Sequence, residues 1–209
     1  MSRLLAERRL PAERRPALFL DRDGVLNEEV DYLHDPAKLV MIGGVAPVIA
    51  DCNRAGLPVL VMTNQAGIGR GYYQADAFWR VARAIETALA AEGARIDGWY
   101  FCPHRPDDDC ACRKPRPGML TAAAAERGID LARSVFVGDK ISDLEAGRNA
   151  GMRTLLVRTG YGRADERCLL AEGRASLFDA CADALGDARE WLHEQFSLSS
   201  TSAWRRGPG

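Results

Sequence analysis

The stretch Asp21-Arg22-Asp23-Gly24-Val25-Leu26-Asn27 follows directly on the short apolar run Ala17-Leu18-Phe19-Leu20. An uninterrupted apolar run of this length indicates a buried strand of a parallel sheet. Residues that follow such a strand in an open α/β sheet stand at the crevice where ligands bind. Alternation along an extended chain puts the Asp21 and Asp23 carboxylates on one side and turns Arg22 away. An acidic turn would use the same residue types, so this stretch alone leaves a functional site and a plain turn both open.

The rest of the chain alternates between apolar runs and amphipathic segments, which predicts an α/β fold with a parallel sheet and helices on both faces. We expect strands at 17–20, 58–62, 96–101, 134–138 and 153–157. We expect helices at 45–55, 75–92, about 118–128, 142–150 and 177–195. The apolar stripe of the last helix is expected to contain Phe178, Cys181, Leu185, Ala188 and Leu192. Segments 28–44, 66–71 and 158–176 are expected to be loops.

Length and composition favour one domain. With 209 residues, of which 47% are hydrophobic, the chain can bury one good core, which we assign to residues 17–196. Residues 1–16 contain five arginines and are predicted to be a mobile basic arm. Residues 197–209 are rich in Ser, Gly and Pro and are predicted to be a disordered tail.

The net charge and the cysteine pattern indicate which classes of partner and which cellular compartment to expect. The net charge of −1 gives no electrostatic reason to expect nucleic acid or a membrane as a partner. We see no apolar run of the roughly 18 residues that a membrane span needs, and no secretory signal. Three of the six cysteines crowd into residues 102–112 and three are scattered, unlike a disulfide framework. We therefore expect a cytoplasmic protein.

Polar pairs stand at or after four of the predicted strand ends. They are Asp21/Asp23, Thr63/Asn64, Arg113/Lys114 and Asp139/Lys140. Because the carboxyl ends of parallel strands meet at one edge, these groups should converge. A carboxylate nucleophile, a hydroxyl that holds phosphate, a lysine and a second metal-binding carboxylate indicate a phosphoryl-transfer site.

Four motifs contain these residues: DRDGVLN, VMTNQ, CRKPRPGM and VGDKISD, in this order. They resemble the four motifs of the haloacid dehalogenase superfamily. The stretch TNQAGIGRGY and a Cys/His loop directly before RKP narrow the resemblance to the D,D-heptose 1,7-bisphosphate phosphatase and histidinol phosphatase group. The resemblance covers about residues 17–195.

The resemblance implies a Rossmann-like parallel sheet with a small loop-type cap and a zinc-binding loop. It also implies a Mg²⁺-dependent phosphatase that acts through an aspartyl-phosphate. The implied substrate is a phosphorylated sugar: the enzyme would remove the C7 phosphate of D-glycero-D-manno-heptose 1,7-bisphosphate in nucleotide-heptose biosynthesis. We expect a monomer.

Catalytic roles carry over from the resembled family onto matching positions. Asp21 would be the nucleophile. Asp23 would be the general acid and then the general base. Mg²⁺ would lie between Asp21, the Asp23 carbonyl and Asp139. Thr63 would hold a phosphoryl oxygen, and Lys114 would neutralise charge in the transition state.

Further residues are expected around the substrate. The Asn64 backbone amide would hold phosphoryl oxygens. The other expected substrate contacts are Gln65, Arg70, Arg113 and Lys140. Asp143 is left open between a residue that supports the metal and simple helix N-terminal charge.

The second cluster, Cys102-x-His104-x₅-Cys110-x-Cys112, offers three thiolates and an imidazole. A set of four such ligands suits tetrahedral zinc in a structural site. The spacings are tighter than in common zinc fingers, and free thiols or a disulfide stay open on the residues alone. The zinc-bearing members of the resembled group have this arrangement, which implies structural Zn²⁺ here.

Other functions were weighed beside the heptose bisphosphate phosphatase. A histidinol-phosphate phosphatase would use the same machinery on a cationic substrate. A polynucleotide 3′-phosphatase shares related motifs, but the chain lacks an overall basic charge. A zinc-stabilised binding protein with a dead site is disfavoured because Asp21, Asp23, Lys114 and Asp139 are all present.

Overall fold

The computed structural model describes residues 14–198. Most of the predicted basic arm and of the predicted tail therefore lies outside the described residues. Within them, the chain joins the fold before residue 17: Arg15 pairs with Ile129, and the Arg15 N–H donates to the Gly128 carbonyl. None of the helices in this range is long and apolar enough to cross a membrane.

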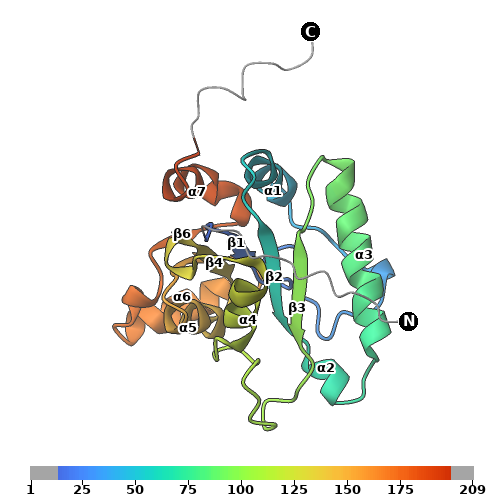
Figure 1. The fold of residues 1–209 in the computed structure, drawn as a ribbon. Helices are drawn as coiled ribbons and strands as arrows, with labels where there is room; N and C mark the ends of the chain where they lie inside the picture. Colours follow the sequence, from blue (N-terminus) through green and yellow to red (C-terminus); the bar gives the residue numbers. More distant parts are fainter. Residues whose placement is uncertain (1–13, 199–209) are drawn as a thin grey trace, which may run out of the picture.

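The centre of the molecule is a parallel sheet of six strands in the order β3-β2-β1-β4-β5-β6 (Figure 1). The strands are β1 (Leu18–Leu20), β2 (Val59–Asn64), β3 (Gly98–Cys102), β4 (Val135–Gly138), β5 (Arg153–Val157) and β6 (Ala180–Ala182). Strand β1 pairs with β2 on one side and with β4 on the other, with Phe19 opposite Leu60 and Phe136. The chain after β1 therefore emerges between the ends of β2 and β4, two strands that are not consecutive in the sequence. This is the reversal of strand order at which open α/β sheets bind ligands.

Helices cover both faces of the sheet, as predicted. One face carries α1 (Val45–Arg54), α3 (Ala75–Ala91) and α7 (Arg189–Gln195), and the other carries α4 (Gly118–Arg127), α5 (Ile141–Asn149) and α6 (Gly162–Ala171). Alternate strand residues feed the two sides: Leu18 and Leu20 belong to the core on the first face, and Phe19 to the core on the second. Short 3₁₀ helices at Pro36–Lys38, Leu131–Arg133, Ala175–Leu177 and Leu185–Ala188 join these elements.

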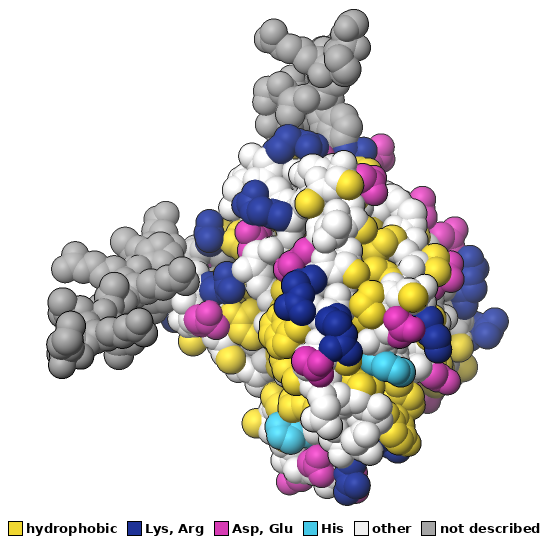
Figure 2. Space-filling model, turned by 90° about the vertical axis from the view of Figure 1, so that its right-hand side faces the viewer, with side chains coloured by type: hydrophobic (Ala, Val, Ile, Leu, Met, Phe, Trp, Pro, Cys, Tyr) yellow, Lys and Arg dark blue, Asp and Glu magenta, His cyan; other side chains and the backbone are white. Residues whose placement is uncertain are grey.

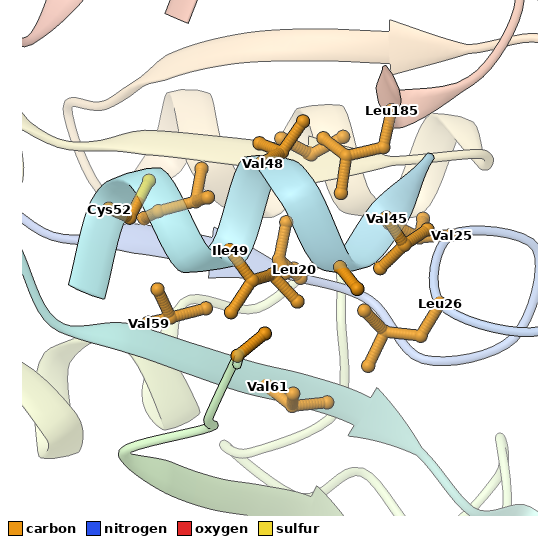
Figure 3. Packing of buried hydrophobic residues seen from close by; sticks show 14 of the residues in the cluster. Leu20, Val25, Leu26, Val45, Val48, Ile49, Cys52, Val59, Val61 and Leu185 are labelled. Atoms are coloured by element: carbon orange, nitrogen blue, oxygen red, sulfur yellow. The ribbon is translucent and has the colours of Figure 1, made fainter. Parts of the chain in front are cut away.

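The core on the first face shows why α1 docks where it does. Its residues Val45, Val48 and Ile49 are buried. Ile49 points toward the sheet residue Leu20, whereas Val48 points toward Leu185 and Val45 toward Val25 (Figure 3). The predicted stripe of α3 is also confirmed, because Phe78, Val81, Ala82, Ile85 and Leu89 are all buried. Burial of such side chains contributes roughly 1.5–3 kcal/mol each and fixes both helices against the sheet.

Segment 66–71 was expected to be a loop but begins with a short helix, α2 (Ala66–Gly69). The glycines are used here for close packing rather than for an irregular path. A Cβ at Gly67 would lie 2.3 Å from a Tyr73 ring carbon, and one at Gly69 would lie 2.7 Å from the Pro103 carbonyl oxygen. The prediction failed because it took glycine only as a breaker of helices.

The last 40 described residues were also assigned wrongly in part. Segment 158–176 contains α6, which buries only Gly162 and Leu169 and so lacks a clear apolar stripe. Segment 177–195 is not one helix: strand β6 and a 3₁₀ helix come before α7. The apolar residues from Phe178 to Leu192 have the spacing of a helical stripe, but the first and the last of them pack in different clusters. Phe178 packs against the small cluster around Leu169, whereas Leu192 belongs to the core under α1.

Candidate active site

Three carboxylates from different segments meet at the carboxyl ends of β1 and β4. Asp21 follows β1, Asp139 follows β4, and Asp143 lies in the first turn of α5. All three are at most 5% exposed, and one carboxylate oxygen from each lies within 4.8 Å of those from the other two. Asp143, which the sequence left open, is therefore part of the cluster. It also serves the helix end, because its Oδ2 accepts the Lys140 backbone N–H at 3.1 Å.

Lys114 enters this cluster from the loop between β3 and α4. Its Nζ lies 3.0 Å from Asp21 Oδ1 and 2.7 Å from Asp143 Oδ1, and donates to the Met62 carbonyl at 2.8 Å. Asn64 fastens the loop, because its side chain pairs with both backbone polar groups of Lys114, at 3.1 Å each. The side chain of Asn64 was not assigned this task from the sequence, where only its backbone amide was considered.

The electrostatics of the cluster favour a bound cation. Burial raises the pKa of Asp21 to about 6, against the opposing charge of Lys114. Burial, with the charges of Asp143 and Asp21, raises the pKa of Asp139 to about 8. Three carboxylates face one ammonium, and Asp139 Oδ1 is buried without a hydrogen-bond partner among the described residues. Clustered carboxylate oxygens with one unpartnered oxygen fit Mg²⁺, a hard cation that takes oxygen ligands.

The turn around Asp139 leaves no room for larger residues. Gly24 has φ +78°, a backbone conformation that favours glycine, and a Cβ there would lie 2.2 Å from Asp139 Oδ2. A Cβ at Gly160 would meet the same oxygen at 2.2 Å. The Tyr161 backbone N–H donates to Asp139 Oδ2 at 2.9 Å, which directs the other oxygen, Oδ1, into the cluster.

Asp23 lies beside the cluster, with its carboxylate held by side-chain donors. Asn27 Nδ2 donates to its Oδ1 at 3.0 Å. Arg22 was expected to turn away, but its guanidinium folds back onto the same carboxylate, with distances of 3.0 Å from Nε and 2.6 Å from Nη2. Strand alternation failed here because β1 ends at Leu20, and the turn after it is not extended.

The small pocket above these groups is lined by Asp21, Asp23, Thr63, Asn64, Lys114, Lys140, Ser142 and Asp143. Gln65 does not line it. Its amide supports the wall instead, donating to Thr63 Oγ1 at 2.9 Å while Tyr73 Oη donates to Gln65 Oε1 at 2.8 Å. Gln65 was predicted near the site. In the structure it is 3% exposed and lies behind Thr63.

A second, wider pocket continues outward from Asp23. It is lined by Arg22, Asp23, Glu29, Asp31, Tyr32, Asn64, Gln65, Ala66, Tyr73, Arg113, Lys140 and Tyr161. Lys140 Nζ pairs with Glu29 Oε2 at 2.7 Å and lies 4.5 Å from the centre of the Tyr161 ring. Four of the predicted substrate contacts therefore line this pocket: Asn64, Gln65, Arg113 and Lys140. Arg70 is exposed at the end of α2 and lines neither pocket.

The Cys/His cluster lies in the loop that carries Lys114. The sulfur atoms of Cys102, Cys110 and Cys112 are 3.3–3.5 Å apart, and His104 Nδ1 lies 3.6 Å from Cys102 Sγ and 3.3 Å from Cys112 Sγ. Ligands about 2.0–2.3 Å from zinc in a tetrahedron lie roughly 3.5–3.8 Å from one another. The four atoms therefore fit a single Zn²⁺, with every position filled by protein.

Comparisons with known proteins give a consistent result. A family model described as HAD-hydrolase-like matches residues 111–187. The chain is 43% identical over 192 residues to the D-glycero-D-manno-heptose-1,7-bisphosphate 7-phosphatase of Thermosynechococcus vestitus, covering 85% of this chain and 95% of that protein. It is 40% identical over 180 residues to the D-glycero-beta-D-manno-heptose-1,7-bisphosphate 7-phosphatase of Yersinia pestis, covering 82% of this chain and 92% of that protein.

A solved structure agrees with these relatives. The D,D-heptose 1,7-bisphosphate phosphatase from B. bronchiseptica, complexed with magnesium and phosphate, matches with a TM-score of 0.78 and 36% identity. The match covers 86% of this chain and 99% of that chain.

Proposed function

The chain belongs to the haloacid dehalogenase-like phosphatases, in the family of heptose-1,7-bisphosphate 7-phosphatases, and we propose that it removes the C7 phosphate of D-glycero-D-manno-heptose 1,7-bisphosphate. The observation that carries this is the placement of Lys114 Nζ 3.0 Å from Asp21, beside Asp139 and Asp143. A nucleophilic carboxylate with a cation at its oxygen, next to a carboxylate cluster, suits attack on a phosphate ester. We place the reaction in the cytoplasm.

Asp21 attacks phosphorus with a carboxylate oxygen. As the new bond forms, the bond from phosphorus to the C7 oxygen breaks, and its electron pair goes to that oxygen. Lys114 faces the attacking carboxylate and offsets the negative charge that collects on the phosphoryl group. Thr63, held by Gln65 at 2.9 Å, and the Asn64 backbone amide bind phosphoryl oxygens. Mg²⁺, bound by Asp21, the Asp23 carbonyl and Asp139, would screen the carboxylate from the anionic ester.

Asp23 moves the proton in both halves of the reaction. It gives a proton to the departing C7 oxygen, which leaves as the alcohol. It then takes a proton from the water that attacks the aspartyl-phosphate, and Asp21 is returned as a carboxylate. One water is consumed, and inorganic phosphate and heptose 1-phosphate are released.

The substrate assignment is tested with purified protein and four compounds: both anomers of the heptose bisphosphate, a heptose 7-monophosphate, and histidinol phosphate. Glu29 and Asp31 in the outer pocket would suit a cation, which gives the histidinol ester a physical basis as the second candidate. Glu29 is already paired with Lys140, and so the bisphosphate is favoured. A preference for histidinol phosphate would remove the sugar assignment and leave the aspartate chemistry in place.

Arg113→Ala is expected to lower kcat/KM for the bisphosphate about tenfold more than for the 7-monophosphate. Arg113 lines the outer pocket, where its guanidinium can bind the C1 phosphate that only the bisphosphate carries. Arg70→Ala is the matched control, since Arg70 lines neither pocket, and it should change the two substrates equally. Equal losses with Arg113→Ala would mean that this residue serves the transferred phosphate or the loop.

Metal removal should separate the two metals. Mild EDTA treatment is expected to abolish activity that Mg²⁺ alone restores, while zinc stays bound to its four protein ligands. Cys110→Ser should lose the zinc and lower the melting temperature by several degrees. Cys168→Ser is the control, because Cys168 is exposed and outside the cluster. Elemental analysis that finds no zinc in protein purified under reducing conditions would contradict the zinc assignment.

A further inference from the structure

Arg22 is a buried cation that the mechanism above does not use. It is 1% exposed and has the largest of the fully buried side chains within residues 14–198. The guanidinium lies 5.9 Å from the centre of the Phe78 ring, and its Nη2 lies 3.4 Å from the Leu33 carbonyl oxygen. Its Nη1 has no hydrogen-bond partner among the described residues. A buried charge with an unsatisfied donor destabilises a fold, which suggests that this arginine is kept for a task.

The contacts of Arg22 point to the Asp23 carboxylate. Nε lies 3.0 Å from Oδ1 and Nη2 lies 2.6 Å from Oδ2. The planar fork of a guanidinium fixes the plane of the carboxylate that it holds, which a single point charge cannot do. Because the Phe78 ring and the Leu33 carbonyl enclose the guanidinium, the fork itself has little freedom.

The two oxygens of Asp23 are not held equally. Oδ1 accepts from Arg22 Nε and from Asn27 Nδ2, both at 3.0 Å. Oδ2 accepts from Arg22 Nη2 at 2.6 Å, and its other contact, with Gln65 Nε2, is long at 3.4 Å. Oδ2 is therefore the oxygen with a lone pair available to another partner. Asp23 lines both the small pocket and the outer one, so that partner can come from the substrate.

We propose that Arg22 is the positioning residue for proton transfer, holding Asp23 so that Oδ2 exchanges the proton with the leaving oxygen. The proposal rests on the function proposed above. In the first half, the proton passes from Oδ2 to the C7 oxygen as the bond to phosphorus breaks. The guanidinium then faces the carboxylate left behind. In the second half, the same oxygen takes a proton from the attacking water.

The test compares two leaving groups. An alkoxide is a poor leaving group and needs the proton, whereas p-nitrophenolate is stable without one. Arg22→Met is therefore expected to lower kcat for heptose bisphosphate by about 10²-fold, toward the low end of what general acid catalysis contributes. Hydrolysis of p-nitrophenyl phosphate should fall by no more than about threefold in its phosphorylation step. Retained activity on p-nitrophenyl phosphate also shows that the variant is folded.

Asp23→Asn should show the same split, and Arg22→Met added to it should change the sugar reaction by less than about twofold, because the two residues act as one unit. Arg22→Lys, which keeps the charge but not the fork, should lie between Arg22→Met and wild type. Arg80→Met is the surface control, since its side chain is 52% exposed, and it should change neither substrate.

The outcomes separate the two hypotheses. If Asp23→Asn gives no split, the proton-transfer role of Asp23 fails, and the Arg22 proposal fails with it. If Asp23→Asn gives the split but Arg22→Met lowers both substrates equally, Arg22 has only a structural role and this proposal alone is overturned. If Arg22→Met does not fold, the ratio of the two activities in Arg22→Lys decides in the same way.

Discussion

Asp21→Asn is expected to abolish turnover, with kcat reduced to the background of the assay. The carboxylate oxygen of Asp21 forms the covalent bond to phosphorus, and the Asn amide is too weak a nucleophile to replace it. Wild-type protein quenched during turnover should carry one added phosphoryl group on the peptide that contains Asp21. The variant should carry none.

The same substitution should leave the fold intact. Burial raises the pKa of Asp21 to about 6, so the ionised form at neutral pH is less favourable in the folded protein than in the unfolded chain. The folded protein therefore loses stability as the pH rises from the ordinary pKa of Asp21 toward about 6 and the buried carboxyl ionises. A neutral Asn avoids the cost of burying that charge. Without added metal, the variant should melt at the same temperature as wild type or higher. Asp76→Asn, at a surface carboxylate that is 68% exposed, is the matched control: it should leave activity unchanged and lower the melting temperature only slightly, because it removes a surface ion pair with Arg80. Near-wild-type turnover by Asp21→Asn in the presence of Mg²⁺ would refute the assignment.

The strands at the centre of the sheet could be predicted because each contains a short apolar run bounded by polar residues. Strand β5 was predicted at its observed bounds, and β1, β2, β3 and β4 within two residues. Strand β6 lies at the edge, has three half-buried residues, and carries no such signal. Helix α6 was missed for a related reason: most of its residues stay in solvent. Strand β3 is also a half-buried edge strand, but it was predicted because Trp99–Phe101 form an apolar run. An apolar run in the sequence, more than burial itself, therefore decided what could be predicted.

Site residues could be predicted where they directly follow strands of the parallel sheet. Asp21 and Asp139 had to converge because β1 and β4 are parallel, and they do. Arg22 and the side chain of Asn64 were not predicted, since their partners depend on turns and loops whose path has no simple period. The sequence did contain a signal for Arg22. A cationic side chain in a tight turn between two aspartates can be buried only if it pairs with a carboxylate, and Asp23 is adjacent.

The distribution of charge over the surface is relevant to the kind of partner that the protein can bind. On the face shown in Figure 2, side chains of both charges are interspersed over the molecule. A protein that follows a nucleic-acid backbone needs cations gathered along one surface. On this face the arrangement is that of an ordinary solvated surface.

Lys114→Met is expected to lower kcat by about 10³-fold, as the loss of a preorganised charge contact in a buried site does. Lys114 is 4% exposed, and its ammonium lies 3.0 Å from the attacking carboxylate and 2.7 Å from Asp143. Met keeps most of the volume and removes the charge. Some activity should remain, unlike in Asp21→Asn, because the nucleophile and the metal ligands are still present.

The dependence of the rate on Mg²⁺ concentration distinguishes loss of the Lys114 charge from a general distortion of the site. Without the ammonium, the cluster of Asp21, Asp139 and Asp143 loses the cation that contacts two of its carboxylates, and the repulsion among them grows. A divalent cation should then bind more tightly, so Lys114→Met should reach half of its low maximal rate at less Mg²⁺ than wild type. Lys140→Met is the comparison, since Lys140 is already paired with Glu29 at 2.7 Å, and it should change KM more than kcat. If Lys114→Met instead needs more Mg²⁺, the lysine acts by shaping the metal site, and its assigned role toward the phosphoryl group is wrong.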